Sequence, residues 1–172
     1  MTGTRWDAVV DLTRQPGQVC RAVHDLSTRH WMFVSTANVY ADQATTGQDE
    51  SAALLPPLEA DTMTDPAGYG PAKVACENLV RGTTSSTIVR AGLIVGPGDV
   101  SGRLGYWPWR FARDIAAPVL IPDDSDQPVQ LIDVGDLAWE AGQRIEPRAA
   151  GLDDLENAEL ARALSVDIEA RP

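Results

Sequence analysis

Tyr69 and Lys73 have side chains and a spacing that suit proton transfer. They lie four positions apart, and on a helix this spacing places two side chains on the same face, one turn apart. An unperturbed tyrosine hydroxyl has a pKa of roughly 10, and a neighbouring ammonium lowers the pKa of such a hydroxyl because it favours the phenolate. The pair is a candidate general acid and base, although a tyrosine–lysine pair on an amphipathic helix is more often a surface pair.

Lys73 is the only lysine among the 14 lysine and arginine residues of the chain. Arginine does not readily replace lysine where a compact ammonium with a tunable pKa is needed, so this single position is informative. Thr36 ends an apolar run, where its hydroxyl could hold a substrate oxygen while Tyr69 gives or takes the proton. The residues thus predict a reaction centre of Thr36, Tyr69 and Lys73.

Strands and helices that alternate along the chain would position these residues. Residues 41–64 are polar and acidic, which predicts a long surface segment. Residues 106–113 are aromatic and basic, and predict either a helix that packs its tryptophans on the sheet or a substrate lid. A strand, a helix and a strand in succession indicate a parallel sheet. We expect strands at 7–12, 31–36, 87–90 and 129–132, and helices at 16–29, 65–80 and 137–145.

Composition excludes several functions. A formal net charge of −11, with no basic run, argues against nucleic acid and anionic membranes as partners. No signal peptide begins the chain and no run is long enough to span a bilayer, so we expect a cytoplasmic protein. Cys20, Cys76, His24 and His30 lack the spacing of metal ligands, which predicts reduced thiols and no metal site.

Several segments closely resemble successive motifs of the extended short-chain dehydrogenase/reductases, the NAD-dependent epimerase/dehydratase family. The resemblance covers about residues 6–145 and has the family's order and spacing. YWP at 106–108 is similar to the bacterial sugar-nucleotide-epimerase-like branch. The other segments are FVSTANVY at 33–40, YGPAKVACE at 69–77, VRAGLIVGP at 89–97 and QLIDVGDLA at 130–138.

The resemblance implies an α/β fold with a partial Rossmann-type, doubly wound parallel sheet and flanking helices. It implies that Thr36 orients the substrate, that Tyr69 is the general acid/base, and that Lys73 tunes Tyr69 and binds the nicotinamide ribose of NAD or NADP. The substrate would be a small molecule such as a nucleotide sugar, and the helices at 16–29 and 65–80 would form a homodimer. Cofactor contacts would fall on Leu12, Thr13, Ala91, Gly92 and Leu93, and substrate contacts on Tyr106, Trp107, Arg110 and Gln130.

The family's opening strand, glycine-rich GxxGxxG turn and helix do not occur in this sequence. Without them, the strand at 8–12 would have an unpaired edge, and we expect weak or absent NAD(P) binding by this chain. The chain would be a fragment, the product of a misassigned start, or a reduced protein that completes its sheet with a partner. We expect a truncated catalytic domain at 1–145 and an acidic tail or short helix at 146–172. The alternatives to an enzyme are a catalytically inactive regulatory or oligomerising remnant of the fold and an incomplete product.

Overall fold

The structure, a computed structural model, describes residues 4–99, 105–114, 116, 118–119, 128–150 and 167–171. Strands and helices alternate along most of this chain, as the sequence predicts. Two short 3₁₀ helices, η1 (Ala37–Val39) and η2 (Pro66–Gly68), flank the segment that precedes the second long helix. The other elements are β1 (Arg5–Asp11), α1 (Pro16–Asp25), β2 (Ser27–Thr36), α2 (Tyr69–Arg81), β3 (Ser86–Ala91), β4 (Leu93–Val95), α3 (Tyr106–Arg113), β5 (Leu131–Asp133), α4 (Val134–Ala150) and β6 (Asp167–Arg171).

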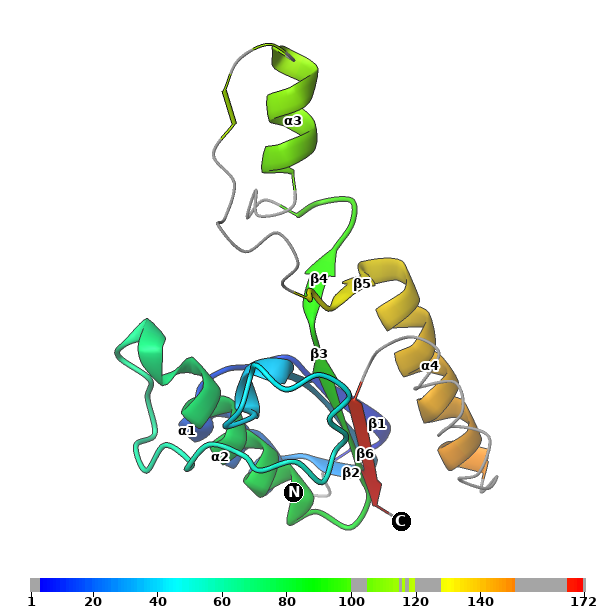
Figure 1. Cartoon of the computed structure of the whole chain (residues 1–172). Helices are drawn as coiled ribbons and strands as arrows, with labels where there is room; N and C mark the ends of the chain where they lie inside the picture. Colours follow the sequence, from blue (N-terminus) through cyan, green and yellow to red (C-terminus); the bar gives the residue numbers. More distant parts are fainter. Residues whose placement is uncertain are drawn as a thin grey trace.

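The main sheet has the strand order β1-β2-β3-β6. The first three strands are parallel, while β6 pairs with β3 in the antiparallel direction. Helices α1 and α2 lie on one face of this sheet and α4 lies on the other (Figure 1). Strands β4 and β5 form a separate parallel pair. The α/β arrangement with a partial Rossmann-type sheet is therefore confirmed.

Side-chain alternation along β2 divides the core into two layers. Trp31 and Phe33 pack with residues of α1 and α2, including Val19 and Cys76. Val34 points to the other face, and its cluster includes Leu137 of α4. Successive side chains of β2 thus pack on opposite faces of the sheet, as expected for a strand that is buried on both faces.

Three helices differ from their expected limits. Residues 66–68 of the helix expected at 65–80 form η2, and α2 begins at Tyr69. Helix α1 ends at Asp25, four residues before the expected end, because Ser27–His30 extend β2 and pair with the start of β1. Helix α4 begins at Val134, three residues before its expected start. Asp133 Oδ1 accepts a hydrogen bond from the backbone N–H of Gly135 at 2.7 Å and so satisfies a donor of its first turn. Within the segment at 146–172, expected to be a tail or short helix, residues 146–150 continue α4 and residues 167–171 form β6.

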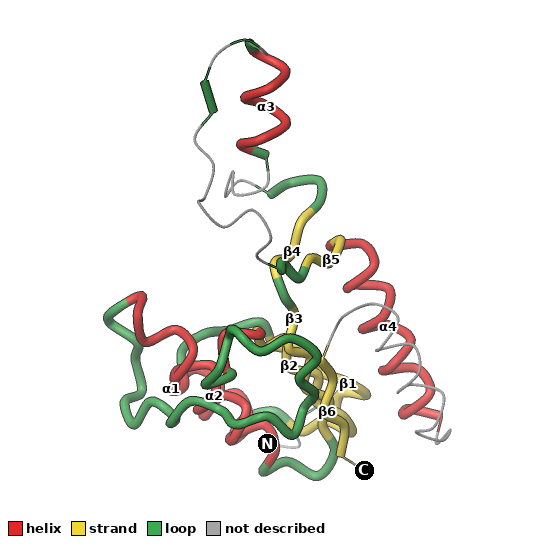
Figure 2. The backbone as a smooth tube through the Cα atoms, viewed as in Figure 1, coloured by secondary structure: helices red, strands yellow, loops and turns green. Residues whose placement is uncertain are grey.

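The segment between η1 and η2 follows a surface path that backbone hydrogen bonds fix (Figure 2). Its residues are mostly exposed, as the sequence predicts, and contain no helix or extended strand. It is anchored to the start of α1 by the N–H of Gly17, which donates to the carbonyl of Asp61 at 2.8 Å, and to α2 by a hydrogen bond between Leu58 and Pro71 at 2.9 Å. These anchors hold the segment across the amino-terminal ends of both helices.

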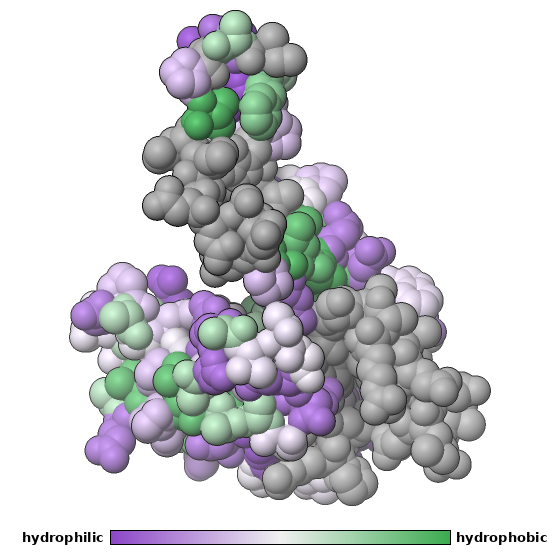
Figure 3. Space-filling model, viewed as in Figure 1, coloured by the Kyte–Doolittle hydropathy of each residue, from purple (hydrophilic) through white to green (hydrophobic). Residues whose placement is uncertain are grey.

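Helix α3 stands away from the main sheet, beyond β4 and β5 (Figure 1). Trp109 is 55% exposed, and the Arg113 guanidinium lies 5.2 Å from the centre of one of its rings. Tyr106 and Phe111 are exposed as well, and Figure 3 shows hydrophobic residues at the surface of this helix. The alternative in which the tryptophans of this helix pack on the sheet is therefore wrong for Trp109, while the side chain of Trp107 lies outside the described residues.

Candidate active site

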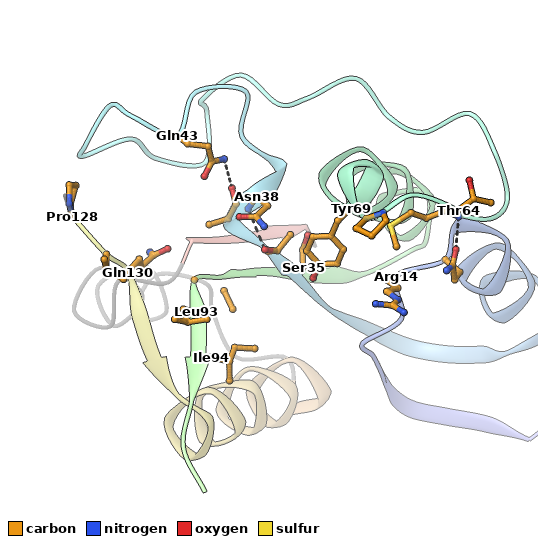
Figure 4. A pocket seen from close by; sticks show the side chains of 18 residues that line it. Arg14, Ser35, Asn38, Gln43, Thr64, Tyr69, Leu93, Ile94, Pro128 and Gln130 are labelled. Atoms are coloured by element: carbon orange, nitrogen blue, oxygen red, sulfur yellow. Dashed lines mark hydrogen bonds between the residues drawn. The ribbon is translucent and has the colours of Figure 1, made fainter. Parts of the chain in front are cut away.

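A cavity of about 850 Å³ opens at the carboxyl ends of β1, β2 and β3. Parallel strands bring the residues that follow them to one edge of the sheet, which is where open α/β sheets bind ligands. Gln43, Met63 and Thr64, from both ends of the surface segment, complete its wall. Figure 4 shows Tyr69 extending from α2 toward the end of β2, with Arg14 on the β1 side.

Thr36 and Tyr69, the two hydroxyl residues expected to do chemistry, both line this cavity. Thr36 is the last residue of β2, and its Oγ1 accepts a hydrogen bond from the N–H of Asn38 at 3.3 Å. That bond uses Oγ1 as an acceptor and leaves the hydroxyl proton available to a ligand oxygen. Tyr69 is half-buried and is the first residue of α2.

Gly70 brings the start of α2 against η1. A Cβ at this position would collide with the carbonyl oxygen of Asn38 and would lie 2.7 Å from Leu55 Cδ1. The absence of a side chain therefore allows the backbone of α2 to approach η1 closely. This approach brings Tyr69 to the cavity that Thr36 also lines.

Lys73 is only 2% exposed and is not among the described residues that line the cavity. Its Nζ donates hydrogen bonds to the carbonyls of Thr13 at 2.8 Å and Val34 at 2.7 Å, and it lies 4.2 Å from the ring centre of Phe33. Burial lowers the pKa of Lys73 to about 8, against an opposing effect of the neighbouring Cys76, Asp11 and Glu77. The single lysine of the chain thus ties the end of β1 to β2.

The expected cofactor residues divide into two groups. Ala91, Gly92 and Leu93 line the cavity, and the N–H of Leu93 donates to the carbonyl of Gln130 at 2.9 Å. Leu12 does not line it and is 69% exposed. Thr13 does not line it either, although its carbonyl receives the Lys73 hydrogen bond.

Thr13 gives a test of whether the residues present fit a nicotinamide cofactor. Its Oγ1 is buried and has no hydrogen-bond partner among the described residues. An unpaired buried hydroxyl costs free energy, which a ligand hydroxyl would recover. Thr13 also adjoins Lys73, a donor that suits the oxygens of a ribose. The unpaired hydroxyl of Thr13 is therefore compatible with a ribose hydroxyl at the end of β1, while neither Thr13 nor Lys73 is among the described residues that line the cavity.

The expected substrate residues are not brought together. Gln130 lines the cavity, whereas Tyr106 and Arg110 lie on α3 and do not. The Nη2 of Arg110 donates to the carbonyl of Pro118 at 3.0 Å. Trp107 belongs to the same helix. Of the three whose side chains are described, only Gln130 shares the cavity with Thr36 and Tyr69.

Sequence reasoning missed Arg14, which lies three residues after the end of β1 at Asp11. It is exposed and is the only charged residue among the described residues that line the cavity. Asn38 and Gln43 also line it and were not predicted. The position of Arg14 could have identified it, because a residue just after a parallel strand lies at the edge where ligands bind.

A buried polar cluster supports the cavity from within the core. Glu77 Oε1 accepts a hydrogen bond from Ser35 Oγ at 2.5 Å, and Arg90 Nη1 donates to the Tyr40 hydroxyl at 3.1 Å. Glu77 and Arg90 form an ion pair with Oε2 and Nη2 2.9 Å apart. Burial opposes the charge of Arg90, but the hydrogen bonds and charge of Glu77 outweigh it and raise the Arg90 pKa.

A parallel sheet between helix layers, with a hydroxyl-lined cavity at the carboxyl ends of its strands, defines an α/β protein of the class that binds nucleotide cofactors. The family model for the NAD dependent epimerase/dehydratase family matches residues 7–140, and the chain belongs to that family. The resemblance noted in the sequence is thereby confirmed. No curated protein gives a significant match. In the described part of the chain, no helix combines the length and apolar character needed to cross a membrane.

Proposed function

We propose that this chain is the catalytic region of an NAD(P)-dependent epimerase, dehydratase or reductase that acts at a carbinol carbon. The observation that carries the proposal is that Thr36 and Tyr69, from different elements, line one cavity at the carboxyl ends of parallel strands. Membership of the epimerase/dehydratase family supports the same class of chemistry. The proposed substrate is a hydroxylated small molecule such as a nucleotide sugar.

The two hydroxyl groups have distinct roles in this proposal. Thr36 binds the substrate oxygen through its hydroxyl proton, while Tyr69 takes the proton of that oxygen as a general base. When bound, a nicotinamide would supply the acceptor for the hydride that leaves the same carbon. In the reverse direction Tyr69 returns the proton as a general acid.

In this proposal Lys73 supports both the proton transfer and the hydride transfer, from a buried position that is not part of the described cavity wall. Its hydrogen bonds to the carbonyls of Thr13 and Val34 fix the ammonium one helical turn from Tyr69. Its third N–H has no partner among the described residues, which suits a ribose hydroxyl. The nicotinamide would lie beside Ala91, Gly92 and Leu93. The proposal covers both NAD and NADP, because the sequence lacks the segment that selects between them.

Turnover of Tyr69→Phe, Thr36→Val and Tyr106→Phe variants tests the proposal. The assay follows reduced nicotinamide by absorbance and sugar epimerisation by NMR, with a panel of nucleotide sugars and both cofactors. Loss of an acid/base group costs roughly 10²- to 10⁴-fold in rate, so we expect at least 100-fold loss for Tyr69→Phe. Tyr106→Phe, which makes the same change on α3, should match the wild type. Equal turnover by Tyr69→Phe and wild type would sink the acid/base role, and no turnover by wild type would favour the inactive remnant.

Sedimentation of the purified chain tests the homodimer that the resemblance implies. The proposed interface consists of α1 and α2, which pack together on one face of the sheet. We expect a dimer, and a monomer at all protein concentrations would contradict the proposal.

A further inference from the structure

We propose that the substrate carries a carboxylate or phosphate group and that Arg14 binds it. This inference rests on the proposed function, because it assigns a substrate class to the same cavity. Arg14 is the only charged residue among the described residues that line the cavity. Its guanidinium has no ion-pair or hydrogen-bond partner in the described part of the chain.

The absence of a protein partner for Arg14 is notable in a chain that has 25 acidic residues. Asp11, three positions earlier, is buried, and its Oδ1 accepts a hydrogen bond from the N–H of Thr13 at 2.8 Å. Asp65 lies between two residues of the cavity wall, and its Oδ1 accepts from the N–H of Ala67 at 2.9 Å. Both carboxylates thus have a hydrogen-bond partner other than Arg14.

An arginine suits an anionic group of a ligand because its planar guanidinium offers several donors in a fixed fork. Hydrogen bonds to charged groups contribute about 1.5–3 kcal/mol each, which corresponds to roughly 10- to 100-fold in affinity. Arg14 shares the cavity with Thr36 and Tyr69, so an anion bound to it belongs to a molecule at the proposed reaction centre.

The rest of the wall indicates the remaining chemistry of the substrate. Its polar side chains are neutral and include the hydroxyl of Thr64 and the amides of Asn38, Gln43 and Gln130. Such groups donate and accept hydrogen bonds to hydroxyls without favouring a second charge. A volume of about 850 Å³ is ample for a sugar ring with an acidic substituent. The combination fits a sugar acid or a sugar phosphate.

Binding experiments separate this inference from the catalytic proposal, because they do not depend on turnover. The ligands are glucuronate, glucose 1-phosphate, neutral glucose and NAD⁺, titrated by NMR chemical shifts against wild type, Arg14→Gln, Arg21→Gln and Tyr69→Phe. Arg21 is an exposed arginine on α1 that does not line the cavity and provides the matched control. Tyr69→Phe keeps the cation and should retain the preference for anionic sugars over glucose, even where it loses turnover.

We expect at least one anionic sugar to bind wild type about tenfold or more tightly than glucose, and Arg14→Gln to abolish that preference. The two anionic ligands show whether the group is a carboxylate or a phosphate. Arg21→Gln should retain the preference. Equal affinity for anionic and neutral sugars, no binding of any sugar, or a preference that survives in Arg14→Gln would overturn the inference. Weaker NAD⁺ binding by Arg14→Gln with unchanged sugar binding would assign Arg14 to the cofactor and overturn it as well.

Discussion

The Glu77 carboxylate accepts two hydrogen bonds from the Arg90 guanidinium, one at Oε1 from Nε at 3.2 Å and one at Oε2 from Nη2 at 2.9 Å. Both side chains are fully buried. Ser35 Oγ donates to the same carboxylate, so one side chain of α2 links β2 and β3. Because Ser35 adjoins Thr36 and Arg90 adjoins Ala91, this cluster fixes the ends of both strands where they meet the cavity.

Glu77→Gln should strongly destabilise the fold. Removing one charge of a buried ion pair leaves the other uncompensated, at a cost of roughly 3–5 kcal/mol in the free energy of unfolding. Urea denaturation followed by circular dichroism measures the change. Glu59→Gln makes the same substitution at an exposed position and should shift that free energy by less than about 0.5 kcal/mol.

A double variant distinguishes a paired charge from general packing. Glu77→Met with Arg90→Met removes both charges, and buried pairs replaced in this way often leave stability unchanged. We expect the double variant to be more stable than Glu77→Met alone, whereas Arg90→Met alone leaves Glu77 paired with Arg81 at 2.9 Å. Additive losses would show that the two side chains contribute independently.

Lys73 should make stability rise with pH in alkaline solution. Its pKa is about 8 in the fold against 10.5 for the ordinary group, so between these values the unfolded chain holds the proton that the folded chain has released. Deprotonation therefore favours the folded state, by roughly 3 kcal/mol across the window. The free energy of unfolding of the wild type minus that of Lys73→Met, measured by urea denaturation from pH 7 to pH 10.5, should therefore rise with pH.

Cys76 should make the free energy of unfolding fall as pH rises, which is opposite to the effect of Lys73. Burial raises the pKa of its thiol from 9.0 to about 11, so the unfolded chain loses this proton first and stability falls as pH rises between these values. Cys76→Ala removes this decline and leaves the Lys73-dependent rise in place. A Cys76→Ala profile parallel to that of the wild type would contradict the assigned direction.

Gly70→Ala should destabilise the fold and disturb the cavity. Its new methyl group would collide with the backbone of Asn38, which cannot move without shifting η1. Overpacking of this kind costs roughly 1–3 kcal/mol. Gly142→Ala, in α4 with nothing within 4 Å of the added carbon, should instead stabilise the chain by about 0.5–1 kcal/mol. Differential scanning calorimetry measures both, and equal effects of the two substitutions would argue against close approach at Gly70.

The two thiols should differ in reactivity. Cys20 is exposed and Cys76 is buried, and both are free. A maleimide added to the folded chain should label Cys20 rapidly and Cys76 only after denaturation. Peptide mapping by mass spectrometry locates the label, and prompt modification of Cys76 in the native chain would contradict its place in the core.

The order of strands and helices in the main sheet was predictable because local pattern determines it. The apolar run at 31–36 and the helical spacing around Tyr69 each specify an element without reference to distant residues. The hydroxyl of Thr36 was predictable for the same reason, since a polar residue that ends a buried parallel strand lies at the edge of the sheet. The residues alone suggested that Thr36 acts together with Tyr69, and the family resemblance supplied the same roles.

Features that depend on distant partners could not be predicted from local pattern. Ser27–His30 have no strand signature of their own and become part of β2 because β1 lies beside them. The strand β6 forms by pairing with β3, about 80 residues earlier in the sequence. Helix α3 lies away from the cavity because of the path that the chain takes through β4 and β5. The local sequence around Tyr106 and Arg110 does not predict that path.

Lys73, the sole lysine, is held within the core by two carbonyl groups. The folded chain therefore presents no lysine amine to acylating reagents. An acyl group found on Lys73 would report an opening event that exposes this one side chain. The rate at which Lys73 is acylated would measure, without any introduced probe, how often the contact between the ends of β1 and β2 is lost.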